Sequence, residues 1–436
     1  MPTTASASID RQIGAIAIPA ALALATEPLA ELCDTAIVGT LGTTALGGVA
    51  IAVRVVSFAS TVFIFLMFAT TTAVARHLGA GDARRAAHEA VTAMWIALAI
   101  GATATVTLLI GGPTFISWLG GSGEVARDAG RYLEIVALSA PGSTLTMAGI
   151  GARRGHLDTR IPLLISAVAA ATNLVADLIL VIGLGFGIAT AAWTTTATAL
   201  ASGITYVVLV VRDARRAGAP LVADRRSLRT QLVVGRDLLV RTVALRTVLT
   251  VATALAARQG EVTLAAYAIA FQIWIFCSYA LDGLEAAGQS LVSHRLGSAT
   301  FHELGTVTAR LFTWGVRVGV ALAVGIVALS WWLPRVFSSD QAVIDAATTA
   351  LWWVAAFAPV SAVAFVGDGM LVGASRQRFL AATMLIASCA FGFVAWAAAP
   401  WGLAGIWAAI SAMMVVRTAG AALGISRLRT MAASAA

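Results

Sequence analysis

The sequence predicts an all-α polytopic membrane protein with twelve transmembrane helices in two six-helix lobes, for three reasons. Only 11% of the 436 residues are charged, 59% are hydrophobic and the mean hydropathy is +0.89, whereas a soluble domain carries about 25% charged residues. Apolar segments long enough to cross a bilayer recur along the chain. Finally, the second half of the chain repeats motifs of the first half.

The apolar segments are spaced as successive spans joined by short loops. Alternate loops are rich in arginine, which places both chain termini in the cytoplasm by the positive-inside rule. We expect the spans at 13–39, 45–75, 89–111, 129–151, 161–183, 187–211, 235–257, 263–293, 304–328, 342–372, 379–399 and 402–425.

The basic charge of the chain belongs to these loops. The net charge of +8 comes from arginine alone, because the sequence contains no lysine. Since the arginines are dispersed over loops between spans, we expect no nucleic acid to be bound. We expect the plasma (inner) membrane as the location and the lipid bilayer as a partner. We also expect a monomer. The three cysteines lie in apolar runs and predict no disulfide framework.

An internal repeat predicts how the spans are grouped. Arg-His-Leu-Gly ending at Gly79 recurs as His-Arg-Leu-Gly ending at Gly297, and 297 − 79 = 218. Pro141 and Pro359 are separated by the same offset. Repeats of six spans run parallel, so the two lobes should be related by a pseudo-twofold axis along the membrane normal. We expect an N-terminal lobe at 1–211, a cytoplasmic arginine-rich linker at 212–234 and a C-terminal lobe at 235–436.

The first span carries three acids on one face. Glu27, Glu31 and Asp34 are spaced i, i+4 and i+7, and a charge at the centre of a spanning helix costs about 2.5–3.5 kcal/mol. The stripe therefore faces a polar cavity, unless the acids pair with arginines elsewhere in the bundle. Pro19 and Pro28 are candidate hinges in the same helix.

Several motifs, taken in order, resemble one transporter family. They are Glu27-Pro28 with Asp34 to Gly39, Arg154-Gly155 with Asp158 to Pro162, Asn173 and Asp177 with Gly183 to Gly187, and the pairs Asp282-Gly283 and Asp368-Gly369. In this order they resemble the multidrug and toxic compound extrusion (MATE) family, in its DNA-damage-inducible protein F (DinF) branch. The resemblance implies a cation-coupled antiporter that exports amphipathic or cationic organic compounds by alternating access.

The resemblance also implies a coupling site in the N-terminal lobe. Asn173 and Asp177 share a helix face at i, i+4, and with Asp34 and Thr195 they form a set of hard oxygen ligands suited to a shared proton or to Na⁺. We expect H⁺ as the coupling ion, with Na⁺ at Asp34, Asn173 and Asp177 as the alternative and no other metal. We expect no cofactor.

The second half does not repeat this site. At offset 218, Asp34 corresponds to Ala252 and Asn173 corresponds to Phe391. The remaining candidates for a substrate or second proton site are Glu27, Glu31, Asp282 and Asp368. For the last two, the alternative is structural pairing with Arg241 and Arg246.

Two other functions are open at this point. A flippase of a lipid-linked precursor would need a strongly basic cavity for a pyrophosphate, and only Arg54, Arg241 and Arg246 are candidates for it. A non-transporting membrane scaffold would leave the acid stripe and the repeat without a purpose. No metalloprotease, nucleotide-loop or Ser-His-Asp signature occurs, so we expect no enzymatic activity.

Overall fold

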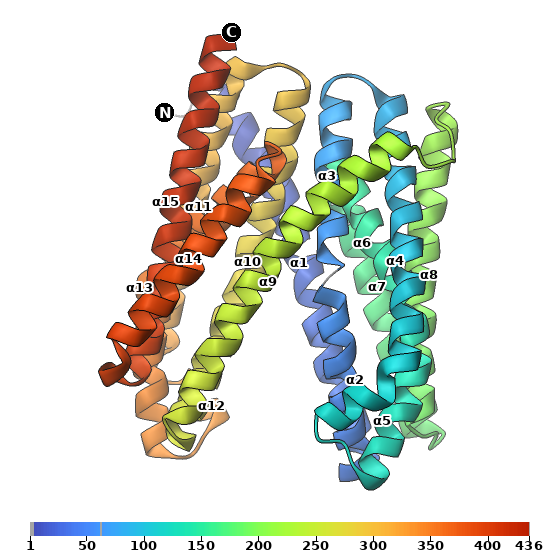
Figure 1. The fold of residues 1–436 in the computed structure, drawn as a ribbon, viewed down its shortest axis with the longest axis vertical. Helices are drawn as coiled ribbons and strands as arrows, with labels where there is room; N and C mark the ends of the chain where they lie inside the picture. The colour runs from blue at the N-terminus through green and yellow to red at the C-terminus, as the bar shows by residue number, and fades with distance from the viewer. Residues whose placement is uncertain (1–3, 62, 436) are drawn as a thin grey trace. The chain divides into compact units, whose positions relative to one another are not determined.

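The computed structural model describes residues 4–61 and 63–435, and every regular element in these ranges is helical (Figure 1). The first half contains α1 (Thr4–Gly39), α2 (Thr43–Thr61), α3 (Ile64–Gly79), α4 (Ala83–Trp118), α5 (Gly123–Val136), η1 (Ala137–Ser139), α6 (Ala140–Gly155), α7 (Arg160–Asp177), η2 (Leu178–Gly183) and α8 (Ile188–Arg216). The second half contains α9 (Arg225–Arg258), α10 (Glu261–Gly297), α11 (Phe301–Leu329), α12 (Leu333–Phe337), α13 (Gln341–Gly373), α14 (Gln377–Ala397), η3 (Ala399–Trp401) and α15 (Leu403–Ala435).

These helices confirm the prediction of an all-α membrane protein. Among the described residues, 11 helices are long and apolar enough to cross a membrane. The expected span at 45–75 is formed by two shorter helices, α2 and α3, and residue 62 between them lies outside the described part of the chain. A bilayer requires internal hydrogen bonds for every backbone group, and helices supply them within each segment.

The helix boundaries carry the repeat that the sequence predicts. α2 begins at Thr43 and α10 at Glu261, while α3 ends at Gly79 and α10 ends at Gly297. Both pairs are 218 residues apart, since 261 − 43 = 218 and 297 − 79 = 218. The same offset relates the starts of α4 and α11 and those of α5 and α13.

The two halves differ in where a span is interrupted. α10 and α13 are continuous, whereas the corresponding segments of the first half are divided into α2 and α3, and into α5, η1 and α6. Pro359 lies inside α13, and its counterpart Pro141 follows the 3₁₀ turn η1. A proline removes one backbone donor from a helix. In the first half, the helix changes geometry next to this proline.

The chain packs as two compact units. One is formed by Met1–Ala21 with Arg236–Ala436, and the other by Leu22–Gly235. The start of α1 therefore belongs with the second half of the chain, and α1 and α9 each continue from one unit into the other. α8 extends to Arg216 and α9 begins at Arg225, so much of the segment expected as a linker is helical.

Each unit has its own apolar core. In the unit Leu22–Gly235, the fully buried Tyr206 lies in a cluster with residues of α3, α4, α6 and α8. Small residues allow close approach in this unit: a Cβ on Gly203 of α8 would lie 2.8 Å from the carbonyl oxygen of Gly142 on α6. In the other unit, Trp407 and Tyr267 lie in a cluster of α9, α10, α13, α14 and α15. Glycine at helix contacts is typical of membrane bundles.

The loops that end two equivalent helices adopt the left-handed backbone conformation. Gly81, after α3, has φ +75°, and Ala299, at the equivalent position after α10, has φ +54°. The Gly81 N–H donates to the Leu78 carbonyl at 3.0 Å, as in a helix C-terminal motif. Only glycine enters this region without a steric penalty.

We expect Gly81→Ala to lower the free energy of unfolding by about 1 kcal/mol, because a Cβ is unfavourable at this φ. No atom lies within 4 Å of the added Cβ, so the effect reports backbone conformation alone. Thermal denaturation in detergent measures it. The control is Gly305→Ala in α11, where the added Cβ also meets open space and helix propensity favours alanine. An equal loss in both variants contradicts the prediction.

Candidate functional site

Asp34 of α1 and Asn173 of α7 are hydrogen-bonded. The Asn173 amide nitrogen donates to Asp34 Oδ1 at 2.9 Å and Oδ2 at 3.3 Å, and the amide oxygen accepts from the Thr195 backbone N–H at 3.2 Å. These partners determine the amide orientation, because the opposite one would set oxygen against oxygen. Asn173 is buried and Asp34 is half-buried. The structure thus brings together residues that are 139 positions apart (173 − 34).

Asp177 lies one turn further along α7 and is bound by α8. The hydroxyl of Thr194 donates to Asp177 Oδ1. Asp177 is 1% exposed, and its second oxygen, Oδ2, has no hydrogen-bond partner among the described residues. α7 ends at Asp177 and continues as the π-helical turn η2, a geometry that is frequent at functional sites. A buried oxygen without a partner is costly, and a proton or a cation would satisfy it.

Thr195 contributes to the site through its backbone more than through its hydroxyl. Its N–H fixes the Asn173 amide, while its hydroxyl donates to the Ala191 carbonyl at 3.0 Å and interacts with the Tyr132 hydroxyl. Tyr132 of α5 is buried and lies within electrostatic reach of Asp34. The sequence indicates Thr195 but misses Thr194 and Tyr132. The sequence marks these two residues only as hydroxyl-bearing side chains in spanning segments, and many other residues of the chain share that property.

The acid site is attached to packed apolar side chains. Ile37 and Val38 of α1, Leu133 of α5 and Val181 of η2 all lie in one buried cluster. Each of them is within four positions of a polar residue of the site along its helix, so the same packing that forms the core sets the positions of the carboxylates. Rigid support of this kind keeps polar groups at hydrogen-bonding distance.

Glu31 is the other acid of the first span whose side chain the structure describes. Glu31, three residues before Asp34, is exposed and lies within electrostatic reach of Asp34. The side chain of Glu27 lies outside the described residues. Pro19 and Pro28 both lie inside the continuous helix α1. No group of three or more His, Cys, Asp or Glu residues suited to a metal occurs in the part of the chain that the structure describes.

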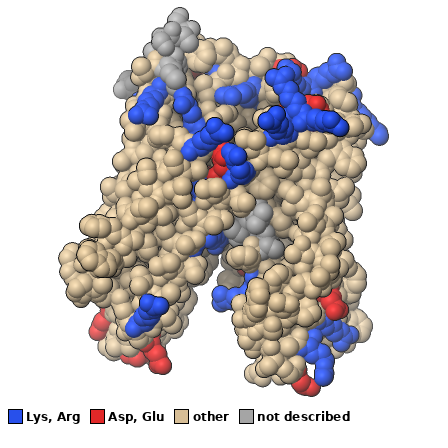
Figure 2. All heavy atoms as spheres, in the orientation of Figure 1, with Lys and Arg blue, Asp and Glu red and all other residues tan. Residues whose placement is uncertain are grey.

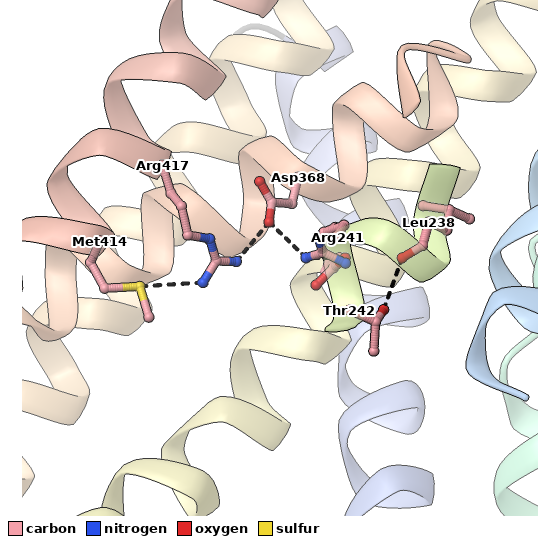
Figure 3. A network of polar contacts seen from close by, with 7 residues as sticks. Leu238, Arg241, Thr242, Asp368, Met414 and Arg417 are labelled. Carbon is pink, nitrogen blue, oxygen red and sulfur yellow. Dashed lines mark hydrogen bonds and ion pairs between the residues drawn. The ribbon is translucent and has the colours of Figure 1, made fainter. Parts of the chain in front are cut away.

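A second cluster of charges is buried in the unit that contains the second half of the chain (Figure 3). Asp368 of α13 accepts at one oxygen, Oδ2, from Arg241 of α9 and from Arg417 of α15, both at 2.6 Å. Arg241 also lies 3.6 Å from Glu285 of α10. All four side chains are at least nine-tenths buried, so two cations and two carboxylates neutralise each other inside the bundle.

Arg417 is held by further contacts. Its guanidinium lies 5.1 Å from the centre of the Phe365 ring and its Nη1 donates to the Met414 sulfur at 3.3 Å. The alternative considered for Asp368, structural pairing with an arginine of the seventh span, agrees with the Arg241 contact, whereas Arg246 is exposed. The sequence alone does not identify Arg417 as a partner of Asp368. The last span carries no second charged residue at helical spacing from Arg417 that would indicate a polar helix face.

The whole chain resembles known transporters. The MatE family profile matches residues 19–179 and 239–396. Protein DETOXIFICATION 43 of Arabidopsis thaliana is 30% identical over 96% of this chain and 90% of its own length. DNA damage-inducible protein F of Escherichia coli is 28% identical over 94% and 90%. A solved structure described as MATE in the bent conformation has a TM-score of 0.88 and 22% identity, covering 99% of this chain and 100% of that chain.

We expect Arg417→Met to destabilise the protein by about 3–5 kcal/mol, because removing one partner leaves buried carboxylates undercompensated. Thermal denaturation of the purified protein in detergent measures the change. Arg427→Met, on an exposed position of the same helix, is the matched control and should shift the melting temperature little. Similar melting temperatures for the two variants would show that Asp368 does not depend on Arg417.

Proposed function

Since the chain belongs to the MatE family of multidrug and toxic compound extrusion transporters, we propose that it is a proton-coupled antiporter that exports amphipathic or cationic organic compounds by alternating access. Members of this family are transporters and not enzymes. The observation that carries the proposal is the hydrogen bond from the Asn173 amide nitrogen to the half-buried Asp34 carboxylate.

Proton uptake at Asp34 changes this bond. An amide N–H bound to a carboxylate makes a charge-assisted hydrogen bond, which is roughly twice as strong as its neutral counterpart. When Asp34 accepts a proton, the bond loses this assistance and the repulsion between Asp34 and Asp177 is removed. Both effects change how α1 is held against α7. Release of the proton restores them, so the packing of α1 follows the protonation state of Asp34.

We propose H⁺ rather than Na⁺ on the basis of the Asn173 orientation that the hydrogen bonds assign in the absence of a cation. A hard cation is bound by oxygen atoms. Here the amide presents its nitrogen to Asp34, and its oxygen is engaged by the Thr195 N–H. Sodium binding at Asp34, Asn173 and Asp177 would require the amide to turn and to lose the Thr195 contact. A proton on Asp34 requires no such rearrangement.

We propose that α1 transmits this change through its proline segment. The packing of α1 passes from one compact unit to the other between Ala21 and Leu22, which lies between Pro19 and Pro28. Proline weakens helical hydrogen bonding locally and permits bending. A change in the contacts of Asp34 with α7 therefore acts on the part of α1 that follows Pro28. The similar solved structure is itself described as a bent conformation of that protein.

The remaining acids have different proposed roles. Glu31 is exposed beside Asp34 and would attract a cationic compound, and we assign Glu27, one turn earlier, to the same role. Asp282 stays a candidate for a second proton or substrate site. For Asp368, two arginine donors on one carboxylate oxygen support a structural ion-pair role rather than a proton site.

The same two arginines weigh against a flippase. A pyrophosphate requires cationic side chains that are free to bind it. Arg241 and Arg417 are engaged by Asp368 and are buried. Of the arginines considered for a flippase, only Arg54 and Arg246 are exposed, and two cations do not make a strongly basic cavity. Export of organic compounds therefore fits the arrangement better. We propose a monomer in the plasma membrane with both termini in the cytoplasm, as the arginine-rich loops indicate.

We expect Asp34→Asn to abolish proton-driven efflux, because asparagine keeps the shape of the side chain but accepts no proton. Efflux of ethidium from proteoliposomes under an imposed pH gradient measures this. Glu124→Gln, at an exposed side chain that pairs with Arg127, controls for loss of one acidic group and should transport like the wild type. Equal gradient-driven efflux by Asp34→Asn and wild type contradicts the assignment of the coupling carboxylate.

A second experiment identifies the ion. Wild-type proteoliposomes should export ethidium when a pH gradient is imposed without Na⁺, and a Na⁺ gradient at constant pH should drive no export. This outcome follows from the proposed proton coupling at Asp34, in which the Asn173 amide donates to the carboxylate. Export driven by Na⁺ alone would contradict proton coupling while leaving the role of Asp34 as an ion site intact.

A further inference from the structure

The connection between α8 and α9 lies against the first turns of α4. The Trp95 indole nitrogen donates to the Leu221 carbonyl at 2.9 Å, and His88 Nε2 lies 3.1 Å from the Val222 carbonyl oxygen. These contacts hold a non-helical segment of the chain along the side of a spanning helix. Val222 is nevertheless 74% exposed and Trp95 is 51% exposed. An exposed apolar side chain beside an interfacial tryptophan is typical of the level where lipid headgroups meet acyl chains.

An apolar groove of about 480 Å³ follows this contact. Its volume is within the range of about 300–1,000 Å³ that is usual for small-molecule sites. All of its lining side chains are apolar, and they come from α4, from the connection and from the start of α9. The lining residues are Trp95, Ile96, Ala99, Ile100, Val222, Ala223, Leu228 and Leu232.

Arginines lie at one end of the groove. On α9, Arg225 is three residues before Leu228 and Arg229 is three residues before Leu232, so these arginines share the helix side of the lining leucines. Both are exposed, and no ion pair with a described carboxylate is recorded for either. Basic side chains gather at the end of this unit where α8 gives way to α9 (Figure 2).

The acids nearest to these arginines have partners of their own. The Asp224 carboxylate accepts from the Ser227 backbone N–H at 3.2 Å and caps the start of α9. Glu89 accepts from the Ser227 hydroxyl at 2.7 Å and from the Gln231 amide at 2.8 Å. Neither acid forms an ion pair with Arg225 or Arg229 among the described residues, and both guanidinium groups are exposed, so they are accessible to an anion from outside the protein.

We propose that this groove binds one anionic phospholipid, with an acyl chain along the apolar lining and the phosphate held by Arg225 and Arg229. Charge complementarity selects the anionic headgroup, and the apolar lining requires a lipid rather than free phosphate. The bound lipid packs on the connection and on α4 together, so it strengthens the attachment of the first turns of α9 to this unit.

Native mass spectrometry of the purified, delipidated protein tests the site. Dioleoylphosphatidylglycerol and dioleoylphosphatidylcholine are added separately at equal concentrations. We expect one phosphatidylglycerol to bind more tightly than phosphatidylcholine. Each basic residue near an anionic surface contributes about 1 kcal/mol, so each arginine removed should reduce this preference about fivefold. Equal binding of the two lipids by the wild type overturns the proposal.

Two pairs of variants test whether the effects are specific to this site. One pair compares loss of arginines here with loss of arginines elsewhere, and the other compares a large side chain inside the groove with one outside it. Arg225→Gln/Arg229→Gln should lose the preference, while Arg84→Gln/Arg85→Gln, at two exposed positions opening α4, should keep it. Ala99→Trp should fill the groove and weaken binding of both lipids, while Ala102→Trp, exposed and outside the groove, should not. A control pair that behaves like its test pair overturns the proposal.

A measurement on the wild-type protein tests the groove even if the variants fail to fold. Dihexanoylphosphatidylglycerol carries the same headgroup with acyl chains too short to follow the groove. We expect it to bind more weakly than the dioleoyl lipid under identical conditions. Equal binding of the short and long lipids would place all of the interaction at the headgroup and would overturn the role of the groove.

Discussion

The structure depends on which donors from other helices reach the carboxylates inside the bundle. Within an apolar bundle an uncompensated charge is expensive, so the acids of this chain are placed where donors from other helices reach them. The Asp34 carboxylate receives a neutral amide, whereas Asp368 receives two guanidinium groups. The helices that carry these donors are thereby fixed in rotation about their own axes.

The choice of partner separates the two halves functionally. A neutral donor leaves the charge of Asp34 uncancelled, which is what the proposed proton coupling requires. Two cations around Asp368 make its ionised form part of the packing, because protonation would expose two buried positive charges to each other. Under the proposed proton coupling, one unit of this repeated fold holds a charge that is gained and lost during transport, and the other holds a charge fixed by ion pairs. The asymmetry lies in side chains and not in helix order.

Much of the fold follows from apolar length and from the repeat. The helix boundaries reproduce the offset of 218, and even the left-handed turn at Gly81 recurs at Ala299, where the residue type alone would not indicate it. The site is less predictable. Helical periodicity relates residues on one helix, as for Asn173 and Asp177, but it does not say which face of α8 turns toward α7. Hence Thr194, and not its neighbour Thr195, supplies the hydroxyl. Periodicity fails to identify Arg417 for the same reason.

The two helices that pass between the compact units carry a mechanical consequence. The covalent crossings occur at Ala21 to Leu22 in α1 and at Gly235 to Arg236 in α9. Both crossings lie within continuous helices, so α1 and α9 each contribute residues to both units. Proline weakens helical hydrogen bonding locally; α1 has Pro19 just before its crossing, whereas α9 contains no proline. A substitution at Pro19 therefore acts on a helix whose two ends pack in different apolar cores.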